Sequence, residues 1–170
     1  MAQPGYGRAV RPRRQEVPKA PPPSSAAARA VMRGNRKTDT RPEIVLRAEL
    51  HRRGRRFRKN ARPEDDIACR VDIVFRAARL AVFLDGCFWH GCPAHGSRPR
   101  TNASYWQPKI ARNIERDREN DELLARRGWT VLRVWEHESP VEAANRVEAE
   151  LSRLSRTGCR DRSSTAGHST

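Results

Sequence analysis

Residues 80–95, with the sequence LAVFLDGCFWHGCPAH, constrain the fold more than any other segment. The apolar residues 80–84 predict a buried strand, which ends at Asp85 and Gly86. Two thiols, two imidazoles and two aromatic rings follow at once: Cys87, Phe88, Trp89, His90, Cys92 and His95. Packing of a core does not require this mixture. We therefore expect the strand to lead into a site where a metal ion, a reaction and a flat ligand meet.

The composition predicts a polyanionic partner. The 170 residues include 35 Lys and Arg against 20 Asp and Glu, a formal charge of +15, and this length suits one domain. Nucleic acid is favoured over an anionic membrane because no basic amphipathic anchor helix is evident. The sequence has no apolar run of about 18 residues and no signal-peptide pattern, so we expect a cytoplasmic protein. Its four cysteines then favour metal ligation or burial over disulfides.

We expect one ordered α/β domain over residues 32–154, flanked by disordered tails at 1–31 and 155–170 that show no hydrophobic period. The domain's predicted elements are helices over 42–53, 108–127 and 140–154 and strands over 69–75, 80–84 and 129–135. The first two strands would form a hairpin. The third follows a helical crossover and would run parallel to a neighbour, which gives one mixed sheet flanked by helices.

Two charged segments show no sequence pattern that points to a specific role. Residues 55–62 are interpreted as a basic link between the first helix and the first strand. The charged side of the 108–127 helix, which includes Asp117, is expected to face solvent.

Three acidic residues stand where apolar residues are expected. Glu43 falls on the apolar stripe of the first helix, and Asp72 lies within the apolar strand residues 71–75. Asp72 and Asp85 on neighbouring strands, with Glu43 beneath them, favour a divalent-cation site. Two alternatives stay open: Glu43 complements the positive N-terminus of its helix, and Asp72 faces solvent.

The cysteine and histidine spacing predicts a structural zinc site. Cys87, Cys92 and His95 supply three ligands from one short loop, and a closed tetrahedral site needs a fourth. His137, directly after the last strand, is the preferred fourth ligand, and Cys69 is the reserve. The alternative is that the cysteines are small buried residues and His95 is a surface histidine.

His90 and the neighbouring aromatic residues are left outside the zinc set. An imidazole near a metal-bound phosphate can take a proton from water or give one to the leaving oxygen. Phe88, Trp89 and Trp106 are either core residues or wedges that enter a DNA base stack.

Taken together, these residues resemble the very short patch repair (Vsr) DNA mismatch endonuclease family. The likeness covers roughly residues 32–154 in unbroken order. The matching segments are Met32 with Arg33, 38–40, Glu43, 85–93 (DGCFWHGCP), 105–106, 109–110, Asn113, 115–117, 128–129 and 134–137 (VWEH).

The resemblance implies a fold similar to that of type II restriction endonucleases, the PD-(D/E)xK type. It also implies a Mg²⁺-dependent cut on the 5′ side of the thymine in a T:G mismatch, which arises when 5-methylcytosine deaminates. Asp72 resembles the metal-binding catalytic aspartate, Glu43 its supporting acid, His90 the acid/base histidine, and Leu84 a residue whose backbone carbonyl serves the metal. The intercalating aromatics match Phe88, Trp89 and Trp106, and the zinc ligands match Cys87, Cys92, His95 and His137.

The chain departs from the best-known bacterial form of the family at two site positions. His137 replaces a cysteine, which keeps a zinc-ligand type. Asp85 replaces a histidine, and its role is left open between a second metal ion and the second acid of a restriction-type nuclease. The phosphate contacts that we expect are Arg33, Arg36, Lys37, Lys109 and Arg112.

The expected partner is double-stranded DNA with a T:G mismatch, and a monomer suits such an asymmetric lesion. The resemblance implies a bacterial enzyme acting at the nucleoid, with a functional link to a DNA cytosine methyltransferase. Two other functions remain open. One is a restriction-like endonuclease that cuts matched duplex, and the other is a zinc-stabilised DNA-binding protein without catalysis.

Overall fold

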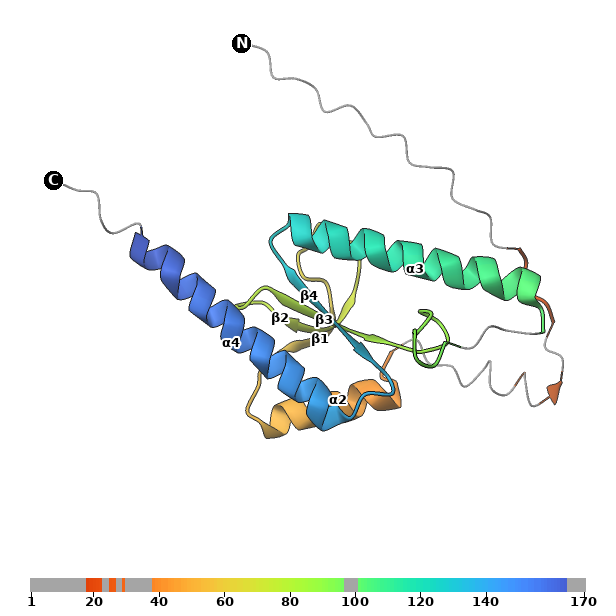
Figure 1. Cartoon of the computed structure of the whole chain (residues 1–170), viewed down its shortest axis with the longest axis horizontal. Coiled ribbons are helices and arrows are strands. Elements are labelled where there is room, and N and C mark those ends of the chain that lie inside the picture. Colours follow the sequence, from red (N-terminus) through yellow and green to blue (C-terminus); the bar gives the residue numbers. More distant parts are fainter. Residues whose placement is uncertain (1–17, 23–24, 27–28, 30–37, 97–100, 165–170) are drawn as a thin grey trace, which may run out of the picture.

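The computed structural model describes residues 18–22, 25–26, 29, 38–96 and 101–164 (Figure 1). Its elements are α2 (Arg41–Arg52), β1 (Arg58–Ala61), β2 (Val71–Phe75), β3 (Leu80–Asp85), α3 (Ala103–Arg126), β4 (Thr130–Trp135) and α4 (Pro140–Ser164). The strands form one four-stranded sheet in the order β1-β2-β3-β4. The α/β class and the single mixed sheet are therefore confirmed.

The sheet joins an antiparallel hairpin to a parallel pair. β2 and β3 are antiparallel, with Ile73 opposite Val82, and a tight turn at 76–79 connects them. β3 and β4 are parallel along their whole length, from Leu80 opposite Thr130 to Asp85 opposite Trp135. The crossover between them is α3, so the predicted hairpin and the predicted parallel strand are both correct.

Helices cover both faces of the sheet. Figure 1 shows α3 on one side and α2 with α4 on the other. Leu80 and Val82 belong to the core beneath α2 and α4, whereas Ala81 and Phe83 belong to the core beneath α3. Because β3 is buried on both faces, its residues 80–84 are continuously apolar rather than alternating.

The observed elements differ from the predicted ones in three places. β1 was missed because its sequence, RKNA, is basic, and its first two residues are exposed on an edge strand. α3 begins at Ala103 and not at Pro108, so this proline lies inside the helix rather than at its start. α4 continues to Ser164, beyond the end expected at 154, so the segment expected to be a disordered tail begins as helix.

The tail expected over 1–31 lies mostly outside the described residues. None of the described helices is long and apolar enough to cross a membrane.

The central position of β3 gives a test of the core. Leu80 is 0% exposed, so Leu80→Ala is expected to lower the free energy of unfolding by about 2 to 5 kcal/mol through lost burial and a residual cavity. Val141 is 52% exposed on α4, and Val141→Ala is expected to change the free energy of unfolding by less than about 0.5 kcal/mol. Urea unfolding followed by circular dichroism measures both, and equal effects would contradict the assigned core.

Candidate active site and metal centre

Asp72 occupies the place where β2 and β3 separate. The two strands pair from Phe75 with Leu80 as far as Ile73 with Val82. Beyond that pair, the backbone N–H of Leu84 donates to Oδ2 of Asp72 at 2.8 Å. A side-chain carboxylate thus accepts the bond that a strand backbone would otherwise accept, and this places a charge at the end of the sheet.

Burial disfavours the charged form of this carboxylate. Burial is the main cause that raises the pKa of Asp72 to about 6; the Leu84 N–H opposes it, while the charges of Glu43 and Asp85 add to it. The charges of Glu43 and Asp85 thus reach Asp72, so the proposal of one acidic site made up of these three residues remains open. Such a group favours a bound cation.

The backbone of Leu84 adds an oxygen to the same place. The carbonyl of Asp85 accepts from the N–H of Glu136 at 3.0 Å, on the β4 side of the strand. Backbone groups of successive strand residues point to opposite edges, so the Leu84 N–H and carbonyl both face the β2 side, where Asp72 lies. A carboxylate and a carbonyl are oxygen ligands of the kind that Mg²⁺ prefers.

Glu43 is fixed by the start of α2. The residue is 5% exposed. One carboxylate oxygen accepts from the Thr40 hydroxyl at 2.8 Å, and the other accepts from the Asp39 N–H at 3.0 Å and from Arg47 at 3.3 Å. These bonds explain why Glu43 is buried: its carboxylate satisfies donors at the N-terminus of α2, as the second interpretation of the sequence expected. It acts on Asp72 through its charge.

Asp85 is 3% exposed and forms an ion pair with Arg133 of β4. Nη1 of Arg133 lies 2.8 Å from both carboxylate oxygens of Asp85. The other side of the guanidinium binds the carboxylate of Asp121 on α3, through Nε and Nη2 at 2.9 Å each. Sequence reasoning did not find Arg133.

His90 is held by an acid that was expected to face solvent. Its Nδ1 lies 2.5 Å from Oδ2 of Asp117 and 3.6 Å from Oδ1 of Asp85. Burial alone would raise the pKa of Asp117, but the hydrogen bond and charge of His90 hold this pKa below its usual value. The prediction of a solvated Asp117 is therefore wrong.

A signal for Asp117 and Asp121 was present in the sequence. Both residues share the helical stripe of Ile110, Ile114 and Leu124, at steps of three and four. Acids on an apolar stripe need a buried partner, which is the argument that singled out Glu43 on the first helix. The partners, His90 and Arg133, come from other elements and are visible only in the fold.

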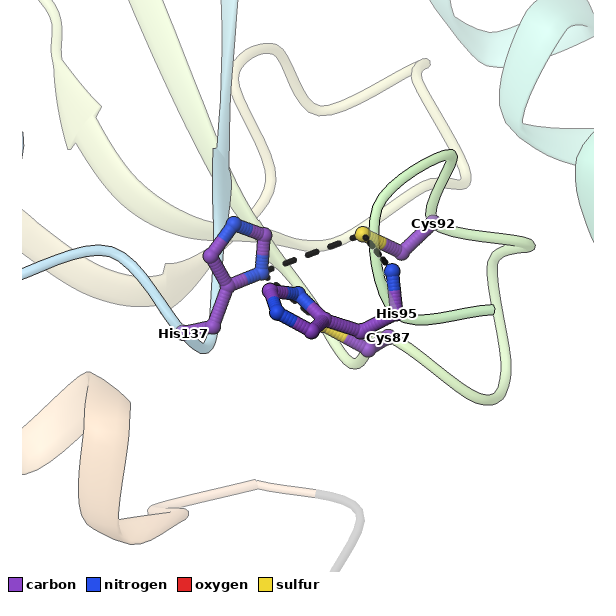
Figure 2. Close-up of side chains that lie close together, drawn as sticks. All are labelled: Cys87, Cys92, His95 and His137. Carbon is purple, nitrogen blue, oxygen red and sulfur yellow. Dashed lines mark hydrogen bonds between the residues drawn. The ribbon is translucent and has the colours of Figure 1, made fainter. Parts of the chain in front are cut away.

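The four predicted zinc ligands come together at the end of β3 and β4. The ligand atoms of Cys87, Cys92, His95 and His137 all lie within 4.8 Å of one another (Figure 2). Nδ1 of His137 lies 3.0 Å from Sγ of Cys87 and 3.8 Å from Sγ of Cys92. Tetrahedral zinc separates its ligand atoms by roughly 3.3 to 3.8 Å, so small shifts of these side chains would bring the four donors to the spacing of such an ion.

Burial, followed by the neighbouring Cys92 thiol, raises the pKa of Cys87 to about 11. A buried pair of thiols becomes a pair of thiolates only beside a cation. Cys69 takes no part in the group, because it packs against the core beneath α3. His137 is thus the better placed of the two candidates for the fourth position.

Backbone hydrogen bonds close the loop that carries these ligands. The N–H of Cys92 donates to the carbonyl of Cys87 at 3.0 Å, and the N–H of Gly96 donates to the carbonyl of Cys92 at 2.6 Å. The N–H of Cys87 donates to the Glu136 carboxylate at 2.7 Å. A side chain at Gly96 would place Cβ 2.3 Å from the Cys92 carbonyl oxygen, so this position requires glycine.

The predicted wedge residues form a cluster beside the loop. The ring centroids of Phe88, Trp89 and Trp106 are 5.2 to 5.5 Å apart, and each ring is half-buried. The side-chain amide of Asn113 on α3 donates to the Trp89 carbonyl at 3.1 Å. Tyr105 packs against Trp106 at 4.9 Å and was not assigned to the wedge.

The expected phosphate contacts are only partly within the described residues. Lys109 and Arg112 lie in the first half of α3 and are half-buried. Arg33, Arg36 and Lys37 fall outside the described part of the chain.

The raised pKa of Asp72 predicts a pH dependence of stability. With a pKa near 3.8 unfolded and about 6 folded, the folded state binds the proton more tightly, so this carboxylate lowers stability as pH rises from about 4 to 6. Each pH unit in that interval is worth about 1.4 kcal/mol. Without Mg²⁺, Asp72→Asn is therefore expected to gain up to about 3 kcal/mol in unfolding free energy at pH 8, and less at pH 5. Urea titrations at both pH values test this, and a gain independent of pH would contradict it.

Comparison with known proteins bears on this site. The family model described as DNA mismatch endonuclease Vsr matches residues 24–95. The chain is 47% identical over 136 residues to the type II nicking enzyme V.NaeI of Lentzea aerocolonigenes, covering 79% of this chain and 82% of the relative. It is 42% identical over 114 residues to V.XorIIP of Xanthomonas oryzae pv. oryzae, covering 65% and 79%. For the DNA mismatch endonuclease Vsr of Escherichia coli K12 the identity is 36% over 106 residues, covering 62% and 66%. The chain belongs to the Vsr family of DNA mismatch endonucleases, which has a restriction-endonuclease-like fold.

Proposed function

We propose that this protein is a Mg²⁺-dependent endonuclease that nicks one strand of duplex DNA on the 5′ side of the thymine in a T:G mismatch. The observation that carries the proposal is Asp72, a buried acid that accepts the Leu84 N–H, with the His90–Asp117 pair at the same end of β3. A nick rather than a double-strand cut is favoured because the two most extensive matches given above are named nicking enzymes.

Asp72 and the Leu84 carbonyl would hold the Mg²⁺ ion, since both offer oxygen ligands on the β2 side of β3. Held by these residues, the ion would supply positive charge to polarise the scissile phosphate and to stabilise the leaving 3′-oxygen. Asp72 has a second reason to bind a cation: its ionised form is disfavoured by burial and by the charges of Glu43 and Asp85. The residues present therefore fit the ion.

His90 would move the proton. Asp117 is held in its ionised form, so its carboxylate accepts a hydrogen bond and Nδ1 of His90 carries the proton. This leaves Nε2 as the basic nitrogen, free to take a proton from the attacking water. Asp117 acts as the acid that orients this imidazole and fixes its tautomer.

The aromatic cluster would select the mismatch. A T:G wobble pair is easier to unstack than a matched pair, so inserting Phe88, Trp89 and Trp106 beside it costs less free energy there. Phe88 and Trp89 directly precede His90 in the chain, and Trp106 packs against both rings from α3. Lys109 and Arg112, together with Arg33, Arg36 and Lys37, would hold phosphates, consistent with the charge of +15.

Cys87, Cys92, His95 and His137 would hold a structural Zn²⁺ ion. The loop between the cysteines carries His90 and two of the three wedge residues, Phe88 and Trp89. A closed zinc site supplies the rigidity that such a loop lacks.

The protein would act as a monomer in the cytoplasm. It would repair the T:G mismatches that deamination of 5-methylcytosine leaves, in functional association with a DNA cytosine methyltransferase.

Cleavage of end-labelled duplexes with Mg²⁺ tests the function. A central T:G pair is expected to be nicked on the thymine strand, whereas T:A and C:G duplexes in the same sequence context are left intact. Asp72→Ala is expected to reduce the rate by a hundredfold or more, on the order of the loss of one electrostatic group in other active sites. Asp65→Ala, which removes an exposed carboxylate, serves as the matched control and is expected to keep the activity.

Each alternative predicts a different result in that assay. Symmetric cutting of the matched duplex would favour a restriction-like endonuclease. Binding without cutting in every context, unchanged by Asp72→Ala, would favour a DNA-binding protein without catalysis.

Atomic emission of the purified protein tests the zinc site. We expect one zinc per chain, loss of zinc in Cys92→Ala, and full retention in Cys69→Ala, because Cys69 lies outside the ligand group. A wild-type protein without stoichiometric zinc, or equal loss in both variants, would rule the site out.

A further inference from the structure

A second group of potential metal ligands lies beside Asp72. The carboxylates of Asp85 and Asp117 and the imidazole of His90 offer ligand atoms within 4.8 Å of one another. By spacing alone, this group would suit a second divalent ion. The role of Asp85, which the sequence left open, depends on whether such an ion binds there.

Arg133 already places a cation against this group. Its Nη1 lies between the two oxygens of Asp85, at 2.8 Å from each, and its Nε and Nη2 bind both oxygens of Asp121. Nη2 also donates to the Asp117 backbone carbonyl at 3.3 Å. The guanidinium carbon lies 4.8 Å from the centre of the Phe83 ring. The cation is thus held from β3 and from α3 at once.

These contacts make Asp85 a poor ligand for a second ion. A metal at Asp85 would lie within a few ångströms of the guanidinium, in a buried setting where like charges repel strongly. Displacing Arg133 instead would leave a largely buried cation without one of its two carboxylates. Both routes are unfavourable while Arg133 keeps its position.

Asp72 has the opposite surroundings. Within the part of the chain that the structure describes, it receives the Leu84 N–H and forms no ion pair, whereas Asp85 and Asp121 share Arg133. Arg47 acts on Asp72 only through its charge and is itself paired with Asp39 and Glu43. The Asp72 charge is therefore the one at this site that a cation from solution would neutralise. The two neighbouring acids therefore differ in the source of their cation: the protein supplies Arg133 to Asp85, whereas Asp72 depends on an ion from solution.

We propose that Arg133 is a built-in cation that takes the place of a second metal ion, so that the protein binds a single divalent ion, at Asp72. The inference rests on the proposed metal-dependent function. Asp85 is then a positioning residue: it fixes Arg133, and through the Asp121 and Asp117 contacts it fixes the part of α3 that orients His90.

Counting bound Mn²⁺ tests this proposal without relying on activity. The zinc-loaded full chain, bound to a T:G duplex already nicked at the expected position, is titrated with Mn²⁺. Free Mn²⁺ is measured by its electron paramagnetic resonance signal, and the duplex alone gives the background. We expect one Mn²⁺ per chain above background, lost in Asp72→Asn and retained in Asp85→Asn.

Arg133→Met removes the charge but keeps an unbranched apolar side chain over Phe83. It is expected to bind two Mn²⁺ per chain, and the second is expected to disappear in the double variant Arg133→Met/Asp85→Asn. Arg133→Lys keeps a charge at this position and is the matched control, with one Mn²⁺ expected. Circular dichroism and zinc content verify that each variant is folded.

Two results would overturn the inference alone: a wild-type protein that binds two Mn²⁺ and loses one in Asp85→Asn, or a folded Arg133→Met that binds only one. Should Arg133→Met fail to fold, the comparison of wild type with Asp85→Asn still decides. A wild-type protein with no Mn²⁺ that depends on Asp72 would contradict the proposed metal site itself, and the inference with it.

Discussion

The hydrogen bond from the Leu84 N–H to the Asp72 carboxylate is the interaction on which the site depends. It is formed because β2 stops pairing with β3 after Ile73 and Val82, which leaves a backbone donor that must be satisfied. A carboxylate meets that need and is buried in doing so. The strand separation therefore creates both the place for a cation and the unfavourable charge that a cation would relieve.

Helix α3 supplies the second half of the site. The parallel pairing of β3 with β4 requires a crossover, and α3 is long enough to pass the ends of both strands. One stripe of this helix carries Asp117 to His90 and Asp121 to Arg133. The helix that closes the topology is thus also the one that orients the candidate proton-transfer group.

The sequence predicted those features that depend on residues close together in the chain. The run LAVFLD, the spacing of Cys87, Cys92 and His95, and the position of Asp72 among apolar neighbours each reflect a requirement within a few residues. Arg133 and Asp117 were missed because their partners lie far away in the chain, and a charged residue on a helix or strand usually faces solvent. β1 was missed because an edge strand needs no apolar pattern.

Trp89 and His90 are consecutive, and α3 holds them through Asn113 and Asp117, which lie one helical turn apart. The ring proposed to probe the base stack and the imidazole proposed to move the proton are therefore mechanically coupled. Were entry of the wedge needed to bring the imidazole to the phosphate, a ring that failed to enter the duplex would keep the imidazole away from it. Fidelity would then be set by geometry at the cutting step as well as by affinity, and engineering of new base preferences in this loop would have to preserve the spacing of these two anchors.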